Sequence, residues 1–447
     1  MDISIDDQQN ANFILRCDKG GELENKLTSL NLQCNITLSL EGNINDDDVT
    51  YLGKFIRKNT QLEKIDLSKC SGLLGIDHNA FELCTHLKSI KLPICIKHIG
   101  NHSFDSCKRL KKILLPDGLE TVGDKAFANC DDLKEINIPN SVSYIGIGSF
   151  HSCHKLTEMN VEDGNTRYSY NNDILYDRVD RTLIKYIPNH PIPDTYATPS
   201  EVIHIGNYAF DGCKGLEKIK VNDGCTDLGE RTFVSCVDLK KVILPKTIDN
   251  IIPNAFENCN KLEYFEVDEN SEHYSSVDGV LYSKNKDILV LCPKSKKSPF
   301  IFPSSVTEIK QGAFAGCLNM HTIYLPSSIK KINEKAFCGC EELRYIDIPS
   351  NINVIGDFAF SECCSLKQIS IYASKPPHCG ISPFDKVTLS NCTVSVPIDS
   401  EINYRSVYGW NQFVNVKESF YITIATNFTF VRKIVLAIKK LLIKSIH

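Results

Sequence analysis

The chain has 447 residues, of which 42% are hydrophobic and 23% are charged, and its formal net charge is −5. This composition is typical of an ordered protein and excludes a disordered one. The small negative charge gives no reason to expect nucleic acid or an anionic membrane as the main partner. The length fits two or three ordinary domains or one elongated repeat array.

Residues 1–35 contain no recognisable repeat unit, and we expect them to cap the N-terminal end of the fold that follows. The opening segment, MDISIDDQQN, lacks both the basic region and the apolar run of a secretory signal. No apolar run anywhere reaches the ~18 residues that a membrane span needs.

Residues 36–75 resemble an ordinary leucine-rich repeat with a full helix on its outer side. The segments LSLEGNIN and LEKIDLSKC flank the helical stretch DDDVTYLGKFIRKN. This alignment places Asn43 and Cys70 at equivalent positions, 27 residues apart.

A unit of 23 residues then recurs in three blocks. Its pattern is I-G-x-x-A-F-x-x-C-x-x-L-x-x-I-x-L-P-x-x-V-x-x. Three residues after each of ten phenylalanines stands a cysteine, and the ten cysteines are Cys84, Cys107, Cys130, Cys153, Cys213, Cys236, Cys259, Cys317, Cys340 and Cys363.

Two periodicities give the unit its predicted structure. Phe, Cys and Leu follow one another at spacings of three, which suits the inward face of a short helical turn. The following L-x-x-I-x-L alternates with period two, which suits a short strand that proline then ends. One unit cannot bury its own apolar face, whereas stacked units can. The sequence therefore predicts an α/β solenoid.

Two longer segments interrupt the 23-residue spacing, at residues 162–204 and 268–308. They align with each other, Tyr168 with Tyr274 and Pro188 with Pro293. Each has short β-like runs around polar turn residues, which predicts a β-hairpin inserted in the stack.

The 23-residue unit resembles the BspA-like, or Treponema pallidum-type, leucine-rich repeat family, which also contains similar extended repeats. The likeness covers roughly residues 76–416. The 23-residue spacing places the three blocks of repeats at residues 76–161, 205–267 and 309–371. Residues 372–416, with the single tryptophan Trp410, resemble the terminal unit of the family.

Residues 417–447 form a basic tail. Ile434, Ile438, Leu441 and Leu442 would share one helical face, with Lys433, Lys440 and Lys444 on another. One interpretation is a helix packed on the solenoid or a loose extension; the other is an amphipathic helix that contacts a membrane surface.

The cysteines invite four interpretations. A nucleophile needs one activated site rather than ten copies, and a metal needs ligands that converge on one point rather than a line of single thiols. Disulfides between rungs are harder to exclude by distance, although parallel inward side chains do not readily give the required dihedral. We interpret the cysteines as a structural ladder of small buried residues, with no catalytic residue, metal or cofactor.

The positions that flank the isoleucine in L-x-x-I-x-L are expected to face solvent on the strand side, which is concave in leucine-rich solenoids. Exposed tyrosine with basic neighbours is typical of protein-recognition surfaces. The candidate binding residues are Lys91, Lys112, Lys218, Lys220, Lys241, Tyr264, Tyr324 and Tyr345.

No enzyme signature is present, and two functions remain. The family resemblance implies a surface antigen or adhesin-like protein that binds host or cell-surface proteins. The alternative is a cytoplasmic interaction scaffold, favoured by the lack of a signal sequence and by cysteines that look unpaired. The sequence leaves the ligand and the oligomeric state open.

Overall fold

Each 23-residue repeat forms one rung of a β-solenoid, and every rung carries two short strands. The computed structural model describes residues 2–5, 11–28, 30 and 36–427. The chain divides into two units: unit 1 comprises residues 1–192, 201–213 and 228–233, and unit 2 comprises residues 193–200, 214–227 and 234–447. The predicted solenoid is therefore confirmed, and each unit contains a stack of rungs.

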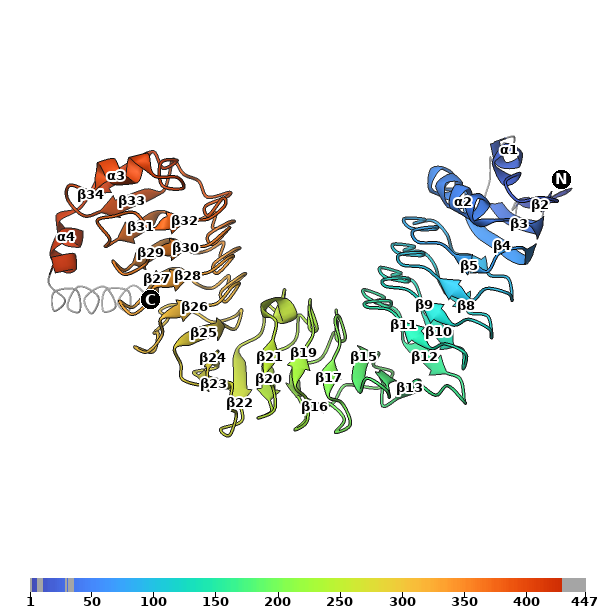
Figure 1. Ribbon diagram of the computed structural model, residues 1–447, viewed down its shortest axis with the longest axis horizontal. Helices are drawn as coiled ribbons and strands as arrows, with labels where there is room; N and C mark the ends of the chain where they lie inside the picture. The colour runs from blue at the N-terminus through green and yellow to red at the C-terminus, as the bar shows by residue number, and fades with distance from the viewer. Residues whose placement is uncertain (1, 6–10, 29, 31–35, 428–447) are drawn as a thin grey trace. The chain divides into compact units, whose positions relative to one another are not determined.

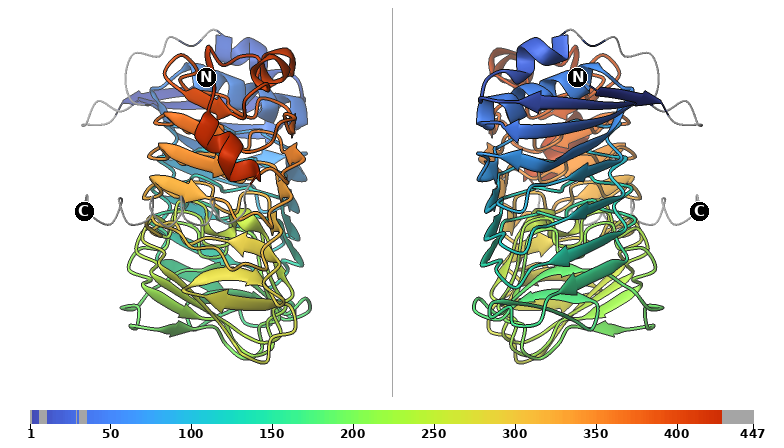
Figure 2. Two further views of the ribbon diagram at one scale, coloured as in Figure 1. Left: turned by 90° about the vertical axis from the view of Figure 1, so that its left-hand side faces the viewer. Right: turned by 90° about the vertical axis from the view of Figure 1, so that its right-hand side faces the viewer.

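Unit 1 begins with a sheet built from the L-x-x-I-x-L segments and the strands before them, in the order β1-β2-β3-β4-β6-β8-β10-β12 (Figures 1 and 2). Apart from the antiparallel pair β1–β2, all neighbours are parallel. The strands are β1 (Asp2–Ile5), β2 (Ala11–Cys17), β3 (Ile36–Asn43), β4 (Leu62–Ser71), β6 (Ser89–Lys91), β8 (Lys112–Leu114), β10 (Glu135–Ile138) and β12 (Glu158–Val161).

A second parallel sheet of unit 1 was not predicted. It is formed by the Ile or Val five residues before each phenylalanine, together with the residue that precedes it, in the order β11-β9-β7-β5. Its strands are β5 (Gly75–Ile76), β7 (His98–Ile99), β9 (Thr121–Val122) and β11 (Tyr144–Ile145). Two residues are too few to show an alternating pattern in the sequence.

Two helices belong to the N-terminal part of unit 1, α1 (Leu23–Thr28) and α2 (Asp46–Lys58). The helix α2 lies where the sequence predicts it and begins with a capping box between Asn45 and Asp48. The expected equivalence of Asn43 and Cys70 is wrong. Register shifts in the β3–β4 ladder pair Gly42 with Cys70 and Asn43 with Ser71.

Both extended segments contain the predicted hairpin. In unit 1, β13 (Tyr168–Asn171) and β14 (Ile174–Asp177) are antiparallel, and β15 (Thr182–Tyr186) continues to β17 (His204–Ile205). Unit 2 repeats this arrangement with β23 (Tyr274–Val277), β24 (Val280–Ser283) and β25 (Ile288–Leu291). The central residues of the first turn, Asn172 and Asp173, both have positive φ, as in type I′ turns.

The remaining strands of unit 2 form its rungs, and β19 (Asp227–Leu228) crosses the boundary between the units. One sheet has the order β16-β18-β20-β22, another continues from β25 through β26-β28-β30-β32, and a third has the order β27-β29-β31-β33-β34. The strands are β16 (Tyr196–Ala197), β18 (Lys218–Lys220), β20 (Lys241–Leu244), β21 (Asn250–Ile251), β22 (Tyr264–Val267), β26 (Glu308–Ile309), β27 (Thr322–Tyr324), β28 (Lys331–Ile332), β29 (Tyr345–Ile348), β30 (Val354–Ile355), β31 (Gln368–Ile371), β32 (His378–Cys379), β33 (Thr393–Val396) and β34 (Asn415–Glu418).

The C-terminal part of unit 2 adds the helices α3 (Glu401–Ser406) and α4 (Phe420–Asn427). The indole of Trp410 is fully buried, and its Nε1 donates to the Pro377 carbonyl oxygen at 3.0 Å. Its ring packs 5.1 Å from that of Phe384, the last phenylalanine of the stack. The amphipathic pattern predicted for the tail falls on residues 428–447, outside the described residues.

The expected helical turn at each phenylalanine is, in most rungs, a hydrogen-bonded turn of another kind. Residues with positive φ stand two before and two after the phenylalanine, for example Lys125 (51°) and Asn129 (56°) around Phe127. They interrupt the helical backbone, and a 3-10 helix is assigned only at Pro253–Phe256 among the described rungs. The physical reason is that alternate N–H groups of the turn donate to the neighbouring rung, whereas the N–H groups between them donate to carbonyl oxygens three residues back in the same chain.

This direction is the same in successive rungs. The N–H groups of His102, Phe104 and Ser106 donate to the next rung, to the carbonyl oxygens of Asp124, Ala126 and Ala128, each at 2.8 Å. Each rung therefore presents donors on one side and acceptors on the other. The first rung of a stack consequently has carbonyl oxygens with no preceding rung to supply N–H groups.

Cationic side chains supply donors where a block of rungs begins. Arg57 of α2 donates from Nη1 to the carbonyl oxygen of Glu82 at 2.6 Å, and the Lys185 ammonium donates to that of Asp211 at 3.4 Å. In unit 2 the Lys294 ammonium donates to the carbonyl oxygen of Ala315. Lys185 and Lys294 are buried, which is otherwise rare for lysine.

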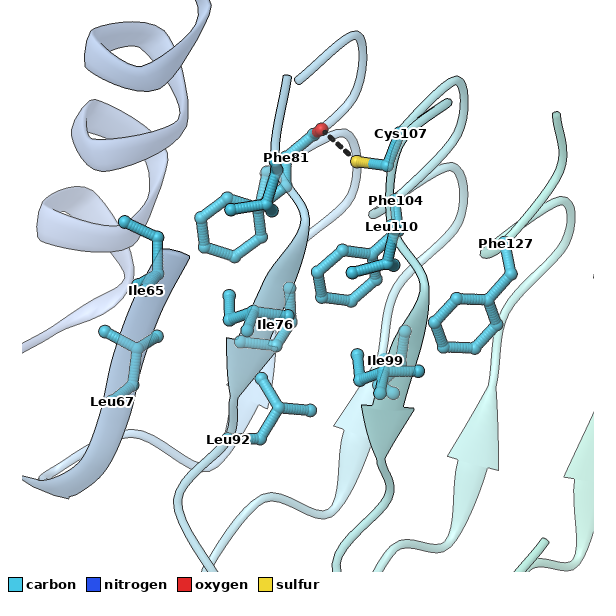
Figure 3. Packing of buried hydrophobic residues seen from close by; sticks show 14 of the residues in the cluster. Ile65, Leu67, Ile76, Phe81, Leu92, Ile99, Phe104, Cys107, Leu110 and Phe127 are labelled. Carbon is cyan, nitrogen blue, oxygen red and sulfur yellow. Dashed lines mark hydrogen bonds between the residues drawn. The ribbon is translucent and has the colours of Figure 1, made fainter. Parts of the chain in front are cut away.

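The core of each unit is a column of stacked rings. In unit 1 the ring centroids of Phe81 and Phe104 lie 5.3 Å apart, and those of Phe104 and Phe127 lie 5.4 Å apart with planes 4° from parallel (Figure 3). In unit 2, Phe337 and Phe360 lie 5.2 Å apart at 2°. These spacings follow the separation of about 4.8 Å between paired strands.

Candidate protein-binding faces

On unit 1 the outward side of β6, β8, β10 and β12 carries charged and amide side chains in columns. Lys91 pairs with Asp66 at 2.9 Å, and Lys112 pairs with Glu135 on the adjacent strand at 2.7 Å. In the next column the Asn160 amide donates to Asn137 at 2.7 Å. Both predicted lysines of this unit are exposed, and both are neutralised by a neighbouring carboxylate.

A hollow of about 260 Å³ lies on this side of β8, β10 and β12. Leu114, whose side chain is 64% exposed, contributes an apolar wall beside Lys112, Glu135 and Asn137. The hollow thus has an apolar side chain next to charged and amide groups.

On unit 2 the strands β18, β20 and β22 bring four of the predicted residues together. The parallel register places Lys218 opposite Lys241 and Lys241 opposite Tyr264. The ammonium of Lys241 lies 5.3 Å from the centre of the Tyr264 ring and also pairs with Glu266. Lys220 is exposed in the next column, and the Tyr264 side chain is 41% exposed.

The two tyrosines of β27 and β29 differ in environment. Tyr345 is 44% exposed, whereas Tyr324 is half-buried, and this burial together with Asp347 raises the pKa of its phenol to about 12. The register places Tyr345 opposite Thr322 and Tyr324 opposite Asp347. Tyr345 is therefore the exposed aromatic contact of this part of unit 2.

The expectation that all positions flanking the central isoleucine face solvent is wrong at three places in unit 2. Thr322, Asp347 and Ser370 are buried. Ser298 lies against Thr322 and donates from Oγ to its carbonyl oxygen at 3.2 Å, and the Tyr372 hydroxyl lies 3.2 Å from Asp347 Oδ2. Ile422 of α4 packs on Tyr372, so segments distant in the sequence cover these side chains.

A larger groove in unit 1 lies beside the two-residue strands β5, β7 and β9. Its volume is about 500 Å³, and its lining includes Asp46, Asp77, His78, His98 and Tyr144. Burial raises the pKa of the Asp46 carboxyl, and the nearby Asp77 adds to the shift. Sequence reasoning missed this groove because it did not predict the strands that form it.

The cysteine ladder is buried throughout. All ten side chains are at most 7% exposed, and no disulfide is formed among the cysteines in the described part of the chain. The Cys107 thiol donates to the carbonyl oxygen of Phe81, one rung earlier, at 3.2 Å (Figure 3), and the Cys340 thiol does the same to Phe314 at 3.1 Å. Burial raises the pKa of the Cys84 and Cys153 thiols to about 12, so they remain protonated at neutral pH.

One cluster in unit 1 has the residue types of a serine-hydrolase triad but not its geometry. His151 Nδ1 lies 2.7 Å from Asp211 Oδ2 and 3.2 Å from Ser152 Oγ. In a triad the serine and the aspartate contact different ring nitrogens, so that the histidine can accept the serine proton. Here both contact Nδ1, and the arrangement is a structural link between rungs.

One group of side chains could hold a metal ion. Donor atoms of Glu82, His102 and Asp105 lie within 4.8 Å of one another. Within the residues that the structure describes, no helix is long and apolar enough to cross a membrane.

Parallel rungs with an L-x-x-I-x-L strand on one side define a leucine-rich repeat protein. The family model of the BspA type leucine rich repeat region matches this sequence in six copies, over residues 50–173, 194–278 and 292–405. The chain belongs to this BspA-type family. A search of curated proteins gave no match.

One of the solved structures to which this chain is similar agrees with this assignment at the level of the fold. A leucine-rich repeat protein from Eubacterium ventriosum is 20% identical, with a TM-score of 0.52 over 80% of this chain and 92% of that one. A leucine-rich cell surface protein from Faecalibacterium prausnitzii is 20% identical, with a TM-score of 0.43 over 83% and 92%. The pneumococcal vaccine antigen PcpA is 19% identical, with a TM-score of 0.42 over 86% and 78%.

Proposed function

We propose that the protein is a non-enzymatic binding protein that recognises another protein through the outward side of its L-x-x-I-x-L strands. The observation that carries the proposal is the lysine cluster on β18 and β20. Like charges directly opposite each other on adjacent strands are destabilising, and Lys218 stands opposite Lys241. Neither Lys218 nor Lys220 forms an ion pair with a described residue, so the cluster retains uncompensated positive charge.

The neighbouring side chains suit a protein partner. Tyr264 lies beside the cluster with two-fifths of its surface exposed, and tyrosine is enriched where interfaces derive their binding energy. An acidic segment of a partner would neutralise Lys218 and Lys220 and cover the tyrosine ring. Membership of the BspA-type family supports an adhesin-like role, in which the partner is a host or cell-surface protein.

An intracellular scaffold is the second candidate, and the cysteines favour it. No disulfide joins any of the 19 cysteines that the structure describes. Secreted proteins usually form disulfides, whereas thiols persist in the reducing cytosol. The two candidates share the binding surface and differ in location.

Labelling of intact cells with a membrane-impermeant reagent, with lysed cells as the control, separates the two locations. Labelling of intact cells supports the adhesin; protection in intact cells and labelling after lysis supports the scaffold.

The binding surface is tested by charge reversal. Immobilised wild-type protein, the Lys218→Glu/Lys220→Glu variant and Lys214→Glu are compared for capture of partners from host and producer-cell extracts. Lys214 is exposed on a turn beside the same rung and serves as the matched control. The double variant should capture at least tenfold less partner than the wild type, and Lys214→Glu should capture as much as the wild type. Equal capture by all three proteins would contradict the proposed surface.

A further inference from the structure

Glu82, His102 and Asp105 meet on the turn edge of two consecutive rungs of unit 1. Glu82 follows Phe81 directly, and Asp105 follows Phe104 directly, so the two carboxyl groups occupy the same position of adjacent repeats. His102 Nδ1 lies 2.9 Å from Asp105 Oδ2, and one donor atom of each residue lies within 4.8 Å of the other two.

The surroundings fix the orientation of Asp105. Its Oδ1 accepts hydrogen bonds from the Asn129 amide at 2.8 Å and from the Ser106 hydroxyl at 3.0 Å. Its other oxygen, Oδ2, is therefore directed to His102. Asp105 is 9% exposed, so it is held in place before any ligand binds.

Glu82 has the opposite character. Its carboxylate forms no hydrogen bond or ion pair with any residue in the described ranges. The nearby Arg57 uses Nη1 to donate to the Glu82 carbonyl oxygen and does not pair with the carboxylate. The cluster thus holds two carboxylates and one imidazole, and a divalent cation would balance its charge.

We propose that Glu82, His102 and Asp105 bind a Zn²⁺ ion that connects the first two rungs of the BspA-type stack. One imidazole nitrogen and two carboxylate oxygens are ligands that Zn²⁺ accepts, with a further position open to water. In a tetrahedral site, ligand atoms at about 2.1 Å from the ion stand roughly 3.4 Å apart, so the 2.9 Å between His102 Nδ1 and Asp105 Oδ2 would widen by about 0.5 Å. The ion replaces the proton between these two atoms and draws in the Glu82 carboxylate.

The chain contains a matched pair that lacks the third ligand. His151 and Asp211 repeat the contact between a histidine Nδ1 and an aspartate Oδ2. In the rung before Asp211, the position of Glu82 is occupied by His151 itself, directly after Phe150, so no second carboxylate stands there. With one carboxylate instead of two, this pair should not retain the ion.

The test uses the full chain after removal of metals with a chelator. Calorimetric titration should show that the wild type binds one equivalent of Zn²⁺ per chain. The bound Zn²⁺ should also raise the melting temperature of the wild type. Glu82→Gln and His102→Gln should each weaken that site at least tenfold, while His151→Gln leaves it unchanged. Without metal, Glu82→Gln and the wild type should have the same melting temperature, because the Glu82 carboxylate forms no hydrogen bond or ion pair with a described residue that the substitution could remove.

Co²⁺ distinguishes this site from binding to cysteine. The cluster offers only nitrogen and oxygen, so its Co²⁺ complex should show no thiolate charge-transfer band. Equal Zn²⁺ affinity in the wild type and Glu82→Gln, or a thiolate band that survives in that variant, would overturn the proposal.

Discussion

The Sγ atom of Cys130 lies 3.3 Å from the carbonyl oxygen of Phe104, one rung earlier, and donates a hydrogen bond to it. The thiol thereby fills the space beside the phenylalanine column and also links two rungs. Burial raises the pKa of Cys130 well above its ordinary value, so the thiol retains its proton at neutral pH.

Replacement of Cys130 by alanine should therefore lower the free energy of unfolding by about 1–2 kcal/mol, because a small cavity forms and a hydrogen bond is lost. Chemical denaturation measures the change. Cys364 is exposed, and Cys364→Ala is the control, with a change within about 0.5 kcal/mol. A similar loss in both variants would contradict the structural role of the ladder.

Gly53 in α2 should not tolerate alanine, although alanine usually stabilises a helix interior by about 1 kcal/mol relative to glycine. A Cβ atom at this position would lie 1.7 Å from the carbonyl oxygen of Ala80. The helix would have to move off the first rung, and we expect a loss of about 3 kcal/mol or more. The exposed neighbour Lys54→Ala should be nearly neutral in the same denaturation experiment; a stabilised Gly53→Ala would show that the helix does not pack this closely.

Asp48 should be required for the N-terminal end of unit 1. Its carboxylate accepts hydrogen bonds from the backbone N–H groups of Gly21 at 2.7 Å, Leu23 at 3.1 Å and Asn45 at 3.1 Å. Asp48→Ala leaves these donors unsatisfied and should cost about 2–4 kcal/mol. Asp47→Ala, at an exposed position of the same helical turn, is the control. Hydrogen exchange should show loss of protection in α1 in the first variant alone.

Asp211 should make unit 1 sensitive to acid. Burial opposes its charge, but hydrogen bonds from His151 and the Ser152 backbone and the charge of Lys185 together lower its pKa to about 2 from an ordinary 3.8. The group binds protons more weakly in the folded state, so its stabilising effect is complete above pH 4 and is lost as the pH falls towards 2.

The shift corresponds to roughly 2 kcal/mol. The stability difference between wild type and Asp211→Asn should therefore shrink over this pH range, as denaturation curves at several pH values would measure. If the stability difference between the two proteins stays constant between pH 6 and pH 2, the Asp211 carboxylate is not the source of the acid sensitivity.

The repeat and its inward residues could be predicted from the sequence because Phe127, Cys130 and Ile136 recur at fixed spacing in a core that tolerates little variation. The two-residue strands could not, since His98–Ile99 is too short to show a period. The left-handed conformation of the turn residues could not be predicted either. Glycine indicates a positive φ, whereas these positions are occupied by residues such as Lys125 and Asn129.

The candidate binding residues divide in the same way. Exposure of Lys220 and Tyr345 follows from strand alternation within one repeat. Burial of Asp347 depends on Tyr372 and α4, which are brought to it by the fold, and no local pattern records such a contact. The metal-binding cluster likewise joins residues of two repeats whose spacing differs from any short metal motif.

The uniform direction of the hydrogen bonds between rungs also bears on how such a chain can change length in evolution. Within a block, successive rungs offer donors at the same three positions to the next rung and acceptors at the same positions to the preceding one. Deletion or duplication of one whole unit therefore rejoins matching groups, and the arginine or lysine at the beginning of the block keeps its role. Gene copies that differ by 23 codons, or by a multiple of 23, can both encode folded proteins, whereas a change of another size within a block would bring unmatched groups into contact.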